Sequence, residues 1–349
     1  MNCYINHTEL KKCLFQERKG EMASLREKFK NGIYGVAVGD ALGGSVQFSA
    51  REELRNCPVE GMKDGEVYPA GTFSDDTSMT LALAESLGHL NDVNYEDIME
   101  NFVLWLGKGK FTSDGKAWDQ GFTCVTAIKN WIYRKERNWP ENVLDCGLWE
   151  FEDNGNGSLM RILPVSFYIY AKYGKESYAH GDIVRNVSKL THAHQISQFA
   201  CEFYCNMIYQ MLDNPKMSKK EIFERTKDIM NKIWSSENMK AEKEELKGVF
   251  NRLFSNDFEA LDDEDIQSGG YVVHSLEAAL WCFLNSSDYR ECTLKAVNLG
   301  HDADTTAAIA GGLAGIFYGE IPQEWLNELR GKTVIEESIK DMASMIYID

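Results

Sequence analysis

The sequence Asn298-Leu299-Gly300-His301-Asp302-Ala303-Asp304-Thr305-Thr306 joins two carboxylates and two hydroxyls to a run of small residues that continues from Ala307 to Gly319. Hard divalent cations prefer oxygen ligands, so Asp302, Asp304 and Thr305 are candidate metal ligands. Asp and Thr are also preferred helix caps, so this turn alone fits either half of a metal site or an ordinary helix start. The small residues after it recur every four positions, which predicts a helix with one small face: Ala307, Gly311, Gly315 and Gly319.

A second stripe of small residues lies nearer the N-terminus, in the stretch from Gly32 to Gly44. Gly35, Gly39 and Gly43 fall on one face of a predicted helix. A helical glycine costs about 1 kcal/mol relative to alanine, so three on one face indicate close approach by a neighbouring helix. The spacing is G-x-x-x-G and no strand precedes it, which does not match a dinucleotide-binding loop. We expect the two stripes to pack together at the centre of the fold.

Another oxygen-rich turn runs from Ser74 to Thr77 and precedes an apolar helix. Ser74 is a natural cap, and acidic residues suit the first turn of a helix. The adjacent carboxylates of Asp75 and Asp76 nevertheless repel each other unless a cation lies between them. Together with the turn around Asp304, they supply four carboxylates, which suit two Mg²⁺ or Mn²⁺ ions better than one.

The segment Asn154–Arg161 reads NGNGSLMR and stands before an apolar stretch that is predicted to be helical. A glycine-rich loop at a helix N-terminus presents free backbone N–H groups and favours an anion. The same pattern also fits an ordinary turn with a cap. Asn156, Gly157 and Ser158 are the candidate anion-binding residues.

The sequence Thr191-His192-Ala193-His194 precedes a predicted helix from Ile196 to Leu212. Zinc is one conceivable ligand here, because Cys201 and Cys205 follow with helical i, i+4 spacing. The arrangement of the two histidines matches no common zinc site, so we do not predict one.

The remaining apolar residues recur at helical spacing, without alternating strands, a βαβ rhythm or an internal repeat. We therefore predict one compact all-α domain over residues 29–349. Residues 1–28 are polar and are expected to form an N-terminal extension of one or two short helices outside the core. Residues 50–73, rich in glycine and proline, are expected to be a loop.

The composition narrows the range of partners and compartments. The net charge is −17 without a Lys/Arg stripe, which argues against nucleic acid and weakly favours divalent cations. Nine scattered cysteines without a C-x-x-C pair indicate reduced thiols and a cytoplasmic location. Residues 1–20 lack an apolar signal segment, and the low-charge run from Thr305 to Tyr318 is too short to span a bilayer. We expect no membrane association.

Six motifs in order along residues 30–330 resemble the ADP-ribosylglycohydrolase family, of the dinitrogenase-reductase-activating and ADP-ribosyl-acceptor hydrolase type. Six motifs in sequence are far more specific than any single one. They are G-x-x-x-GDALGG at Gly35–Gly44, PAGTFSDDTSM at Pro69–Met79, NGNGSLMR at Asn154–Arg161, TH at Thr191–His192, GGYVVHSLEAALW at Gly269–Trp281 and NLGHDADTTAAIAGGLAGIFYG at Asn298–Gly319.

The resemblance implies an all-α fold with a two-magnesium centre, in which Asp304 bridges the ions. One ion would be held by Ser74, Asp75, Asp76 and Asp304, and the other by Asp302, Asp304 and Thr305. The ions would grip the ribose diol and orient water at the anomeric carbon, as an oxocarbenium-like transition state requires. The resemblance further implies that Asn156, Gly157 and Ser158 hold the diphosphate, while His192 and Tyr271 line the rest of the ADP-ribose groove.

The implied reaction is Mg²⁺-dependent hydrolysis of the N- or O-glycosidic bond between ADP-ribose and a protein side chain, with arginine as the first candidate. The implied partner is an ADP-ribosylated protein or conjugate. One residue departs from the pattern, because much of the family has glutamate where this chain has Gln47. Gln47 can accept a hydrogen bond or ligate weakly, but it cannot take a proton. Proton transfer would then fall to Asp75 or Asp76.

Two other interpretations of the sequence compete with an active hydrolase. Gln47 supports a weak or inactive member that binds ADP-ribose or a partner, for example an immunity protein whose residues 1–28 block an ADP-ribosyltransferase toxin. A purely structural protein is the other reading. The intact Ser74–Thr77 and Asp302–Thr305 turns argue against it, since a structural protein has no need of two neighbouring carboxylate pairs.

Overall fold

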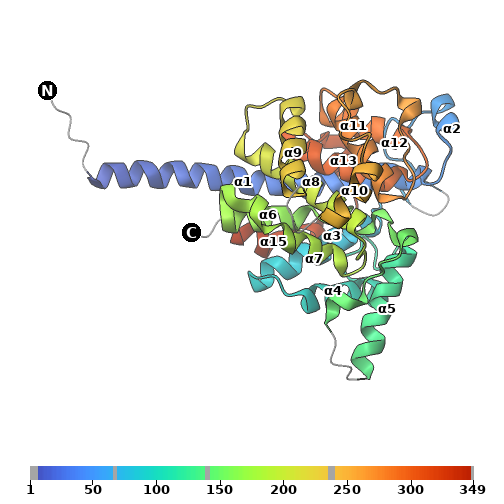
Figure 1. Cartoon of the computed structure of the whole chain (residues 1–349), viewed down its shortest axis with the longest axis horizontal. Helices are drawn as coiled ribbons and strands as arrows, with labels where there is room; N and C mark the ends of the chain where they lie inside the picture. Colours follow the sequence, from blue (N-terminus) through green and yellow to red (C-terminus); the bar gives the residue numbers. More distant parts are fainter. Residues whose placement is uncertain (1–6, 66–68, 138–141, 235–239, 347–349) are drawn as a thin grey trace.

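The computed structural model describes residues 7–65, 69–137, 142–234 and 240–346, with side chains described from residue 25 and omitted at 240–243. Over these ranges the chain forms helices joined by short loops and 3-10 turns, as Figure 1 shows, and the all-α prediction is confirmed. The helices are α1 (His7–Gly43), α2 (Arg51–Asn56), α3 (Asp75–Leu90), α4 (Tyr95–Lys108), α5 (Phe122–Glu136), α6 (Leu163–Tyr173), α7 (Gly181–Lys189), α8 (Gln195–Asp213), α9 (Lys219–Ile233), α10 (Lys240–Val249), α11 (Val272–Leu284), α12 (Tyr289–Asn298), α13 (Ala303–Tyr318), α14 (Gln323–Glu328) and α15 (Lys332–Met345).

Helices α1 and α13 run antiparallel and side by side at the centre, and their small faces lie against each other as predicted. A methyl group added at Gly39 would lie 2.6 Å from the carbonyl carbon of Ala307 and closer still to its oxygen. One added at Gly35 would lie 3.0 Å from the carbonyl carbon of Gly311. Because these neighbours are backbone atoms, only glycine allows the two helices to approach this closely.

Buried tyrosines donate hydrogen bonds to carbonyl groups of this helix pair. Tyr289 Oη donates to the carbonyl oxygen of Gly35 at 2.8 Å, and Tyr204 Oη donates to that of Ile309 at 3.1 Å. Around the central pair, α11 and α12 pack on α13, while α3 packs between α4 and α15. The loops at the C-terminal end of α1 and the N-terminal end of α13 therefore meet at one place.

The structure corrects the predicted ends of several elements. Gly319 does not belong to the packing stripe: it ends α13 with φ of 75°, a conformation that favours glycine. The expected loop over residues 50–73 contains the short helix α2. Cys57 and six other cysteines whose side chains are described are free thiols, as expected, the others being Cys124, Cys146, Cys201, Cys205, Cys282 and Cys292.

The predicted short N-terminal helices are instead the first part of α1, which runs without a break from His7. In Figure 1 this part extends away from the body of the molecule. Leu25 and Phe29 are already buried in the core. A boundary between residues 28 and 29 thus falls inside a continuous helix, and the division into an extension and a domain stays a prediction.

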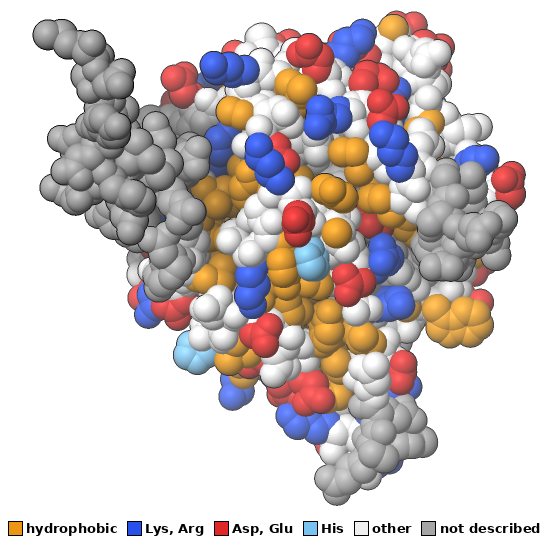
Figure 2. Space-filling view, turned by 60° about the vertical axis from the view of Figure 1, so that its left-hand side comes forward, with side chains coloured by type: hydrophobic (Ala, Val, Ile, Leu, Met, Phe, Trp, Pro, Cys, Tyr) orange, Lys and Arg blue, Asp and Glu red, His pale blue; other side chains and the backbone are white. Residues whose placement is uncertain are grey.

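The surface agrees with the absence of a basic stripe in the sequence. On the face in Figure 2, basic and acidic side chains are interspersed with apolar ones, and the basic ones form no continuous patch. Along the described part of the chain, every helix is too short or too polar to cross a bilayer.

Candidate metal centre and substrate cavity

The turn before α13 brings Asp302, Asp304 and Thr305 to the end of the helix pair where α1 ends and α13 begins. Gly300 and His301 both have left-handed backbone conformations, with φ of 74° and 57°, which turns the chain sharply. Asp302 stands at the N-cap position, but its side chain makes no capping hydrogen bond. Asp304 Oδ1 accepts the backbone N–H of Thr305 at 2.9 Å, while Asp304 Oδ2 is buried without a hydrogen-bond partner. Capping therefore does not account for these side chains.

The turn before α3 is held by a residue from α1. Ser74 caps α3, as predicted, and its hydroxyl donates to Asp76 Oδ2 at 2.9 Å. Asp40, fully buried on α1, accepts the backbone N–H groups of Ser74 and Thr77 at 2.9–3.0 Å and the Thr77 hydroxyl at 2.6 Å. Asp40 thus fixes the turn that carries Asp75 and Asp76. In the sequence, Asp40 is the one acidic residue of the apolar, glycine-rich stretch Gly32–Gly44, and it lies within the G-x-x-x-GDALGG motif.

The two turns bring buried carboxylates together. Asp40, Asp76 and Asp304 each offer one oxygen within 4.8 Å of the others. Asp76 Oδ1 and Asp304 Oδ2 are buried without a hydrogen-bond partner among the described residues, and Thr305 Oγ1 donates to Asp76 Oδ2 at 3.3 Å. Orphaned buried carboxylate oxygens are unfavourable unless a cation neutralises them. This all-oxygen donor set therefore fits a hard divalent cation.

The electrostatics of the cluster support the same conclusion. Burial, and then the charge of a neighbouring carboxylate, raises the pKa of Asp75, Asp76 and Asp304 well above the usual range. Burial raises the pKa of Asp40 to about 6, against the opposing effect of its hydrogen bonds from Thr77 and Ser74. A divalent cation would favour the charged forms of these carboxylates.

A cavity of about 200 Å³ opens directly above the carboxylates. It unites most of the residues predicted from separate parts of the sequence. The predicted site residues on its wall are Gln47, Asp75, Asn156, Gly157, His192, Asp302 and Thr305. Ser74, Asp76 and Asp304 lie buried beneath it. Asp119, Cys124, Met160 and two exposed aromatic residues, Phe48 and Phe122, also line the cavity and were not predicted.

Gln47 reaches the cavity because Phe48 and Ser49 pair with the turn before Asp302. The Phe48 N–H donates to the His301 carbonyl at 2.6 Å, and the His301 N–H donates to that of Ser49 at 2.8 Å. The Gln47 amide nitrogen donates to the carboxylate of Asp119. Asp119 lies in the loop between α4 and α5 with φ of 47°, which Asp tolerates better than most residues. No periodicity in the sequence pointed to Asp119.

The NGNGS loop takes a form different from the prediction. Residues Asn156–Ser158 form a 3-10 turn, and α6 begins only at Leu163, so the loop is not at the N-terminus of that helix. Asn156 Nδ2 donates to Asp302 Oδ2 at 2.6 Å and to Ser275 Oγ at 2.9 Å. Asn156 therefore holds one of the predicted metal ligands in place.

Ser158 and Tyr271 are not on the wall of this cavity. Ser158 is fully buried, and its hydroxyl accepts from Ser188 Oγ at 3.0 Å. Tyr271 immediately precedes α11, its backbone pairs with Gly155, and its ring lies 6.4 Å from that of Phe151 between centroids. The binding roles of Ser158 and Tyr271 stay predictions.

The residues considered for zinc have separate partners. His192 Nδ1 lies 2.7 Å from Thr191 Oγ1. His194 instead caps α8 by accepting the Ile196 N–H at 3.3 Å. Cys201 Sγ donates to Ser158 Oγ at 3.4 Å. None of them belongs to the group of potential metal-ligating side chains found among the described residues, which is Asp40, Asp76 and Asp304.

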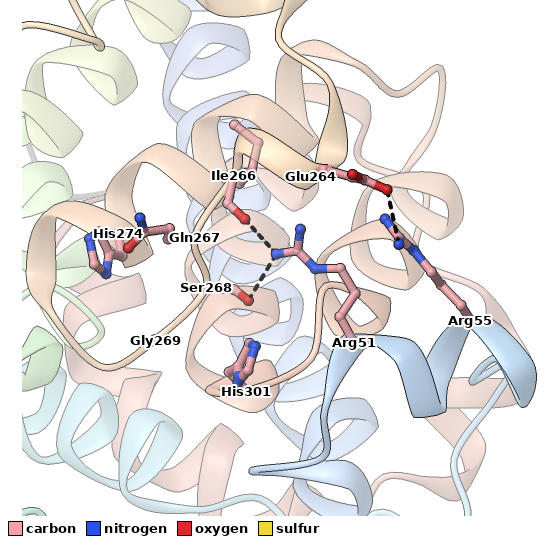
Figure 3. A pocket seen from close by; sticks show the side chains of 9 residues that line it. All are labelled: Arg51, Arg55, Glu264, Ile266, Gln267, Ser268, Gly269, His274 and His301. Atoms are coloured by element: carbon pink, nitrogen blue, oxygen red, sulfur yellow. Dashed lines mark hydrogen bonds and ion pairs between the residues drawn. The ribbon is translucent and has the colours of Figure 1, made fainter.

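A second cavity of about 580 Å³ is lined by Gly269 and by His301, the residue that directly precedes Asp302 (Figure 3). Its central side chain is Arg51, which donates to the Leu299 carbonyl at 2.9 Å and to the carbonyls of Asp263 and Ile266. The next part of that loop is tied to the metal turn, since the Asp302 N–H donates to the Ser268 carbonyl at 2.9 Å. The Arg51 guanidinium is thus already partnered and fixes the loop that supports Asp302.

Comparison with known proteins identifies the family of this chain. The family model described as ADP-ribosylglycohydrolase matches residues 21–348. The chain is 29% identical to a protein named ADP-ribosylarginine hydrolase Tri1 from Serratia proteamaculans, over 92% of this chain and 79% of that one. It is 28% identical to ADP-ribosyl-[dinitrogen reductase] glycohydrolase from Rhodospirillum rubrum, over 91% and 94%.

A solved structure titled ADP-ribosylglycohydrolase-related protein complex has the same fold, with a TM-score of 0.71 and 24% identity over 93% of this chain and 99% of that one. The family match covers nearly the whole chain, including the segments that carry the buried carboxylates and line the cavity above them. The chain belongs to the ADP-ribosylglycohydrolase family and is a hydrolase of that type.

Proposed function

We propose that the protein hydrolyses the bond between ADP-ribose and a protein side chain, using divalent cations, with ADP-ribosylarginine as its substrate. One observation carries the proposal: two partnerless buried carboxylate oxygens, on Asp76 and Asp304, lie beneath a cavity lined by Asp75, Asp302 and Thr305. The printed names of two relatives, an ADP-ribosylarginine hydrolase and an ADP-ribosyl-[dinitrogen reductase] glycohydrolase, support the substrate class.

The proposed ligands of two Mg²⁺ ions, or Mn²⁺, divide along the two turns. Ser74, Asp75 and Asp76 would hold one ion and Asp302 and Thr305 the other, with Asp304 shared. When bound, the cations would supply Lewis-acid binding of the ribose hydroxyls and of a water molecule.

The chain's own side chains would perform the remaining tasks. Asp75, on the cavity wall, would accept a proton from water as the water oxygen bonds to the anomeric carbon. The bond from that carbon to the acceptor nitrogen breaks, and the proton finally resides on the released guanidine. Asp119 supplies a further carboxylate on the wall, and a carboxylate suits the positive charge of an arginine conjugate.

The direct experiment is to incubate the purified chain and Mg²⁺ with a protein carrying ADP-ribose on arginine, and to measure free ADP-ribose. A serine-linked substrate in parallel distinguishes the acceptor. Release from the arginine substrate that EDTA abolishes is expected. Release from neither substrate would overturn the proposed activity, and release only from the serine substrate would overturn the proposed acceptor.

The stabilisation of the protein by Mg²⁺ is expected to change with pH. The folded-state pKa of Asp40 is raised from 3.8 to about 6, so without metal this group lowers stability as pH rises through that window. The pKa values of Asp75, Asp76 and Asp304 are also raised, so these groups likewise lower the metal-free stability as the pH rises. Mg²⁺ binds the deprotonated carboxylates, so its stabilising effect should grow with pH. Thermal denaturation with Mg²⁺ and with EDTA, from about pH 5 to pH 8, measures the difference; a Mg²⁺ effect independent of pH would contradict this assignment.

Introducing glutamate at position 47 tests the interpretation that the chain is a weak or inactive member of the family. Gln47 donates its amide to Asp119, whereas a glutamate there would set two carboxylates against each other. Gln47→Glu is therefore expected to lower kcat/KM by about tenfold or more, a loss of about 1.4 kcal/mol. Gln47→Ala, which removes the donor without adding charge, is the control. Activity that appears only in Gln47→Glu would instead favour a binding protein in the natural chain.

A toxin-blocking activity of the N-terminal segment remains a second candidate, favoured by the extension of α1 away from the body in Figure 1. His7 and Asp40 are 33 positions apart on α1, which corresponds to about 50 Å of helix, so the described start of the segment lies far from the chain's own carboxylate cluster. Since Leu25 is buried, a deletion should stop at residue 24 rather than 28. Protection from an ADP-ribosylating toxin should be lost in this deletion while hydrolysis persists; unchanged protection would exclude a blocking segment.

A further inference from the structure

We infer that Thr191 and the buried Arg161 fix the tautomer of His192, so that His192 presents a permanent Nε2–H donor to an unprotonated oxygen of the substrate. This inference rests on the proposed function for the identity of the ligand, ADP-ribose. It assigns Thr191 and Arg161 as positioning residues, which touch His192 and the loop around it rather than the substrate.

The chain of contacts begins at Arg161, which is fully buried. Its Nη2 donates to Thr191 Oγ1 at 2.7 Å, and its Nη1 donates to the carbonyl of Gly157. A guanidinium has donors only and remains charged, so the direction of these bonds is fixed. One lone pair of Thr191 Oγ1 is therefore occupied by Arg161.

The Thr191 hydroxyl proton then decides the state of His192. Thr191 Oγ1 lies 2.7 Å from His192 Nδ1, and the Cys124 thiol is a further neighbour of the same hydroxyl. An imidazole nitrogen is a stronger acceptor than a thiol sulfur, whereas a thiol can donate weakly. The Thr191 proton therefore goes to His192 Nδ1, which leaves the proton of the neutral ring on Nε2.

The neutral state is favoured by the surroundings of the ring. His192 is buried, and burial together with the charge of Arg161 lowers its pKa to about 3. The hydrogen bond that the structure gives the His192 ring is the one between Nδ1 and Thr191 Oγ1, and Nε2 is on the other side of the ring. It faces Gly155 and Gly157, where an added methyl group would lie 3.4 Å from it in either case.

The absence of side chains at Gly155 and Gly157 leaves Nε2 accessible from the cavity that His192 lines. A methyl group at Gly157 would also lie 2.9 Å from His192 Cε1 and 2.8 Å from Cys124 Sγ. The two glycines thus leave room on the Nε2 side of the His192 ring, while Thr191 holds the ring on its Nδ1 side. A neutral ring in this tautomer donates from Nε2 and cannot accept there, so it selects an unprotonated oxygen such as one of a diphosphate.

The test combines a spectroscopic and a binding measurement on the full chain. ¹⁵N NMR of histidine-labelled protein reports which ring nitrogen carries the proton, and His192→Phe assigns the signal among the seven histidines. The wild type is expected to show a protonated Nε2 and an unprotonated Nδ1. In Thr191→Val the fixed tautomer should be lost, and the Kd for ADP-ribose, measured by calorimetry, should rise about tenfold. Thr191→Ser should restore both.

Thr226→Val is the matched control, because Thr226 is also fully buried but donates within its own helix to Ile222 at 2.9 Å. It should leave the His192 signal and ADP-ribose affinity unchanged. A proton on Nδ1 of His192 in the wild type would overturn the inference, as would wild-type affinity in Thr191→Val. If ADP-ribose fails to bind the wild type, the proposed function fails instead, while the NMR result still decides the tautomer.

Discussion

Replacing Asp304 with asparagine is expected to lower kcat/KM for ADP-ribosylarginine by about 10³-fold or more and to remove the stabilisation by Mg²⁺. Asp304 Oδ2 is buried without a hydrogen-bond partner beside Asp76, and the helix that carries it begins at Ala303. The substitution keeps the size of the side chain but removes the charge that would bridge two cations. Steady-state kinetics and thermal denaturation with and without Mg²⁺ measure the two effects.

The stability of Asp304→Asn measured without Mg²⁺ shows whether its loss of activity comes from lost metal binding or from misfolding. Burial and neighbouring carboxylates raise the pKa of Asp304, which means that its charged form is unfavourable in the folded protein. Without Mg²⁺ the variant should therefore denature at a higher temperature than the wild type near pH 7, and with Mg²⁺ at a lower one. Asp182→Asn, at an exposed position in the first turn of α7, is the control and should change neither value much. More than about a tenth of wild-type activity in Asp304→Asn would contradict a bridging ligand.

Those features of the site that depend on adjacent residues could be predicted from the sequence. The Ser74–Thr77 and Asp302–Thr305 turns each combine a helix start with more acidic groups than a cap requires, and the structure places both beneath one cavity. The glycine stripes predicted the helix pair that brings the turns together, because spacing of four residues defines one helix face.

Apart from this helix pair, individual side-chain contacts between distant segments could not be predicted in this way. Asp40 acts on a turn 34 residues further along, through the backbone N–H of Ser74. Asp119 reaches the site from an irregular loop, where no periodicity assigns a direction to its side chain. Ser158 belongs to the same motif as Asn156, yet its hydroxyl bonds within the core, because the 3-10 turn directs neighbouring side chains apart.

The close packing of α1 on α13 makes Gly39 the position where the smallest substitution should have the largest effect on folding. In Gly39→Ala the new methyl group would lie 2.6 Å from the carbonyl carbon of Ala307, on a backbone that cannot move without displacing α13. Overpacking against backbone is expected to lower the free energy of unfolding by about 3 kcal/mol or more. Denaturant unfolding followed by circular dichroism measures this change.

Gly107→Ala is the matched control, since Gly107 lies on α4 and an added methyl group there has no neighbour within 4 Å. Alanine has the higher helix propensity, so this substitution should stabilise the protein by up to about 1 kcal/mol. The two variants differ only in what the methyl group meets.

Gly39 adjoins Asp40, and Gly43 packs against Asp304, so a shift of α1 against α13 also separates the carboxylates that we propose as metal ligands or supports. Gly39→Ala should therefore weaken Mg²⁺ binding in whatever fraction still folds, and a variant with wild-type stability would show that the two helices are not held at this distance.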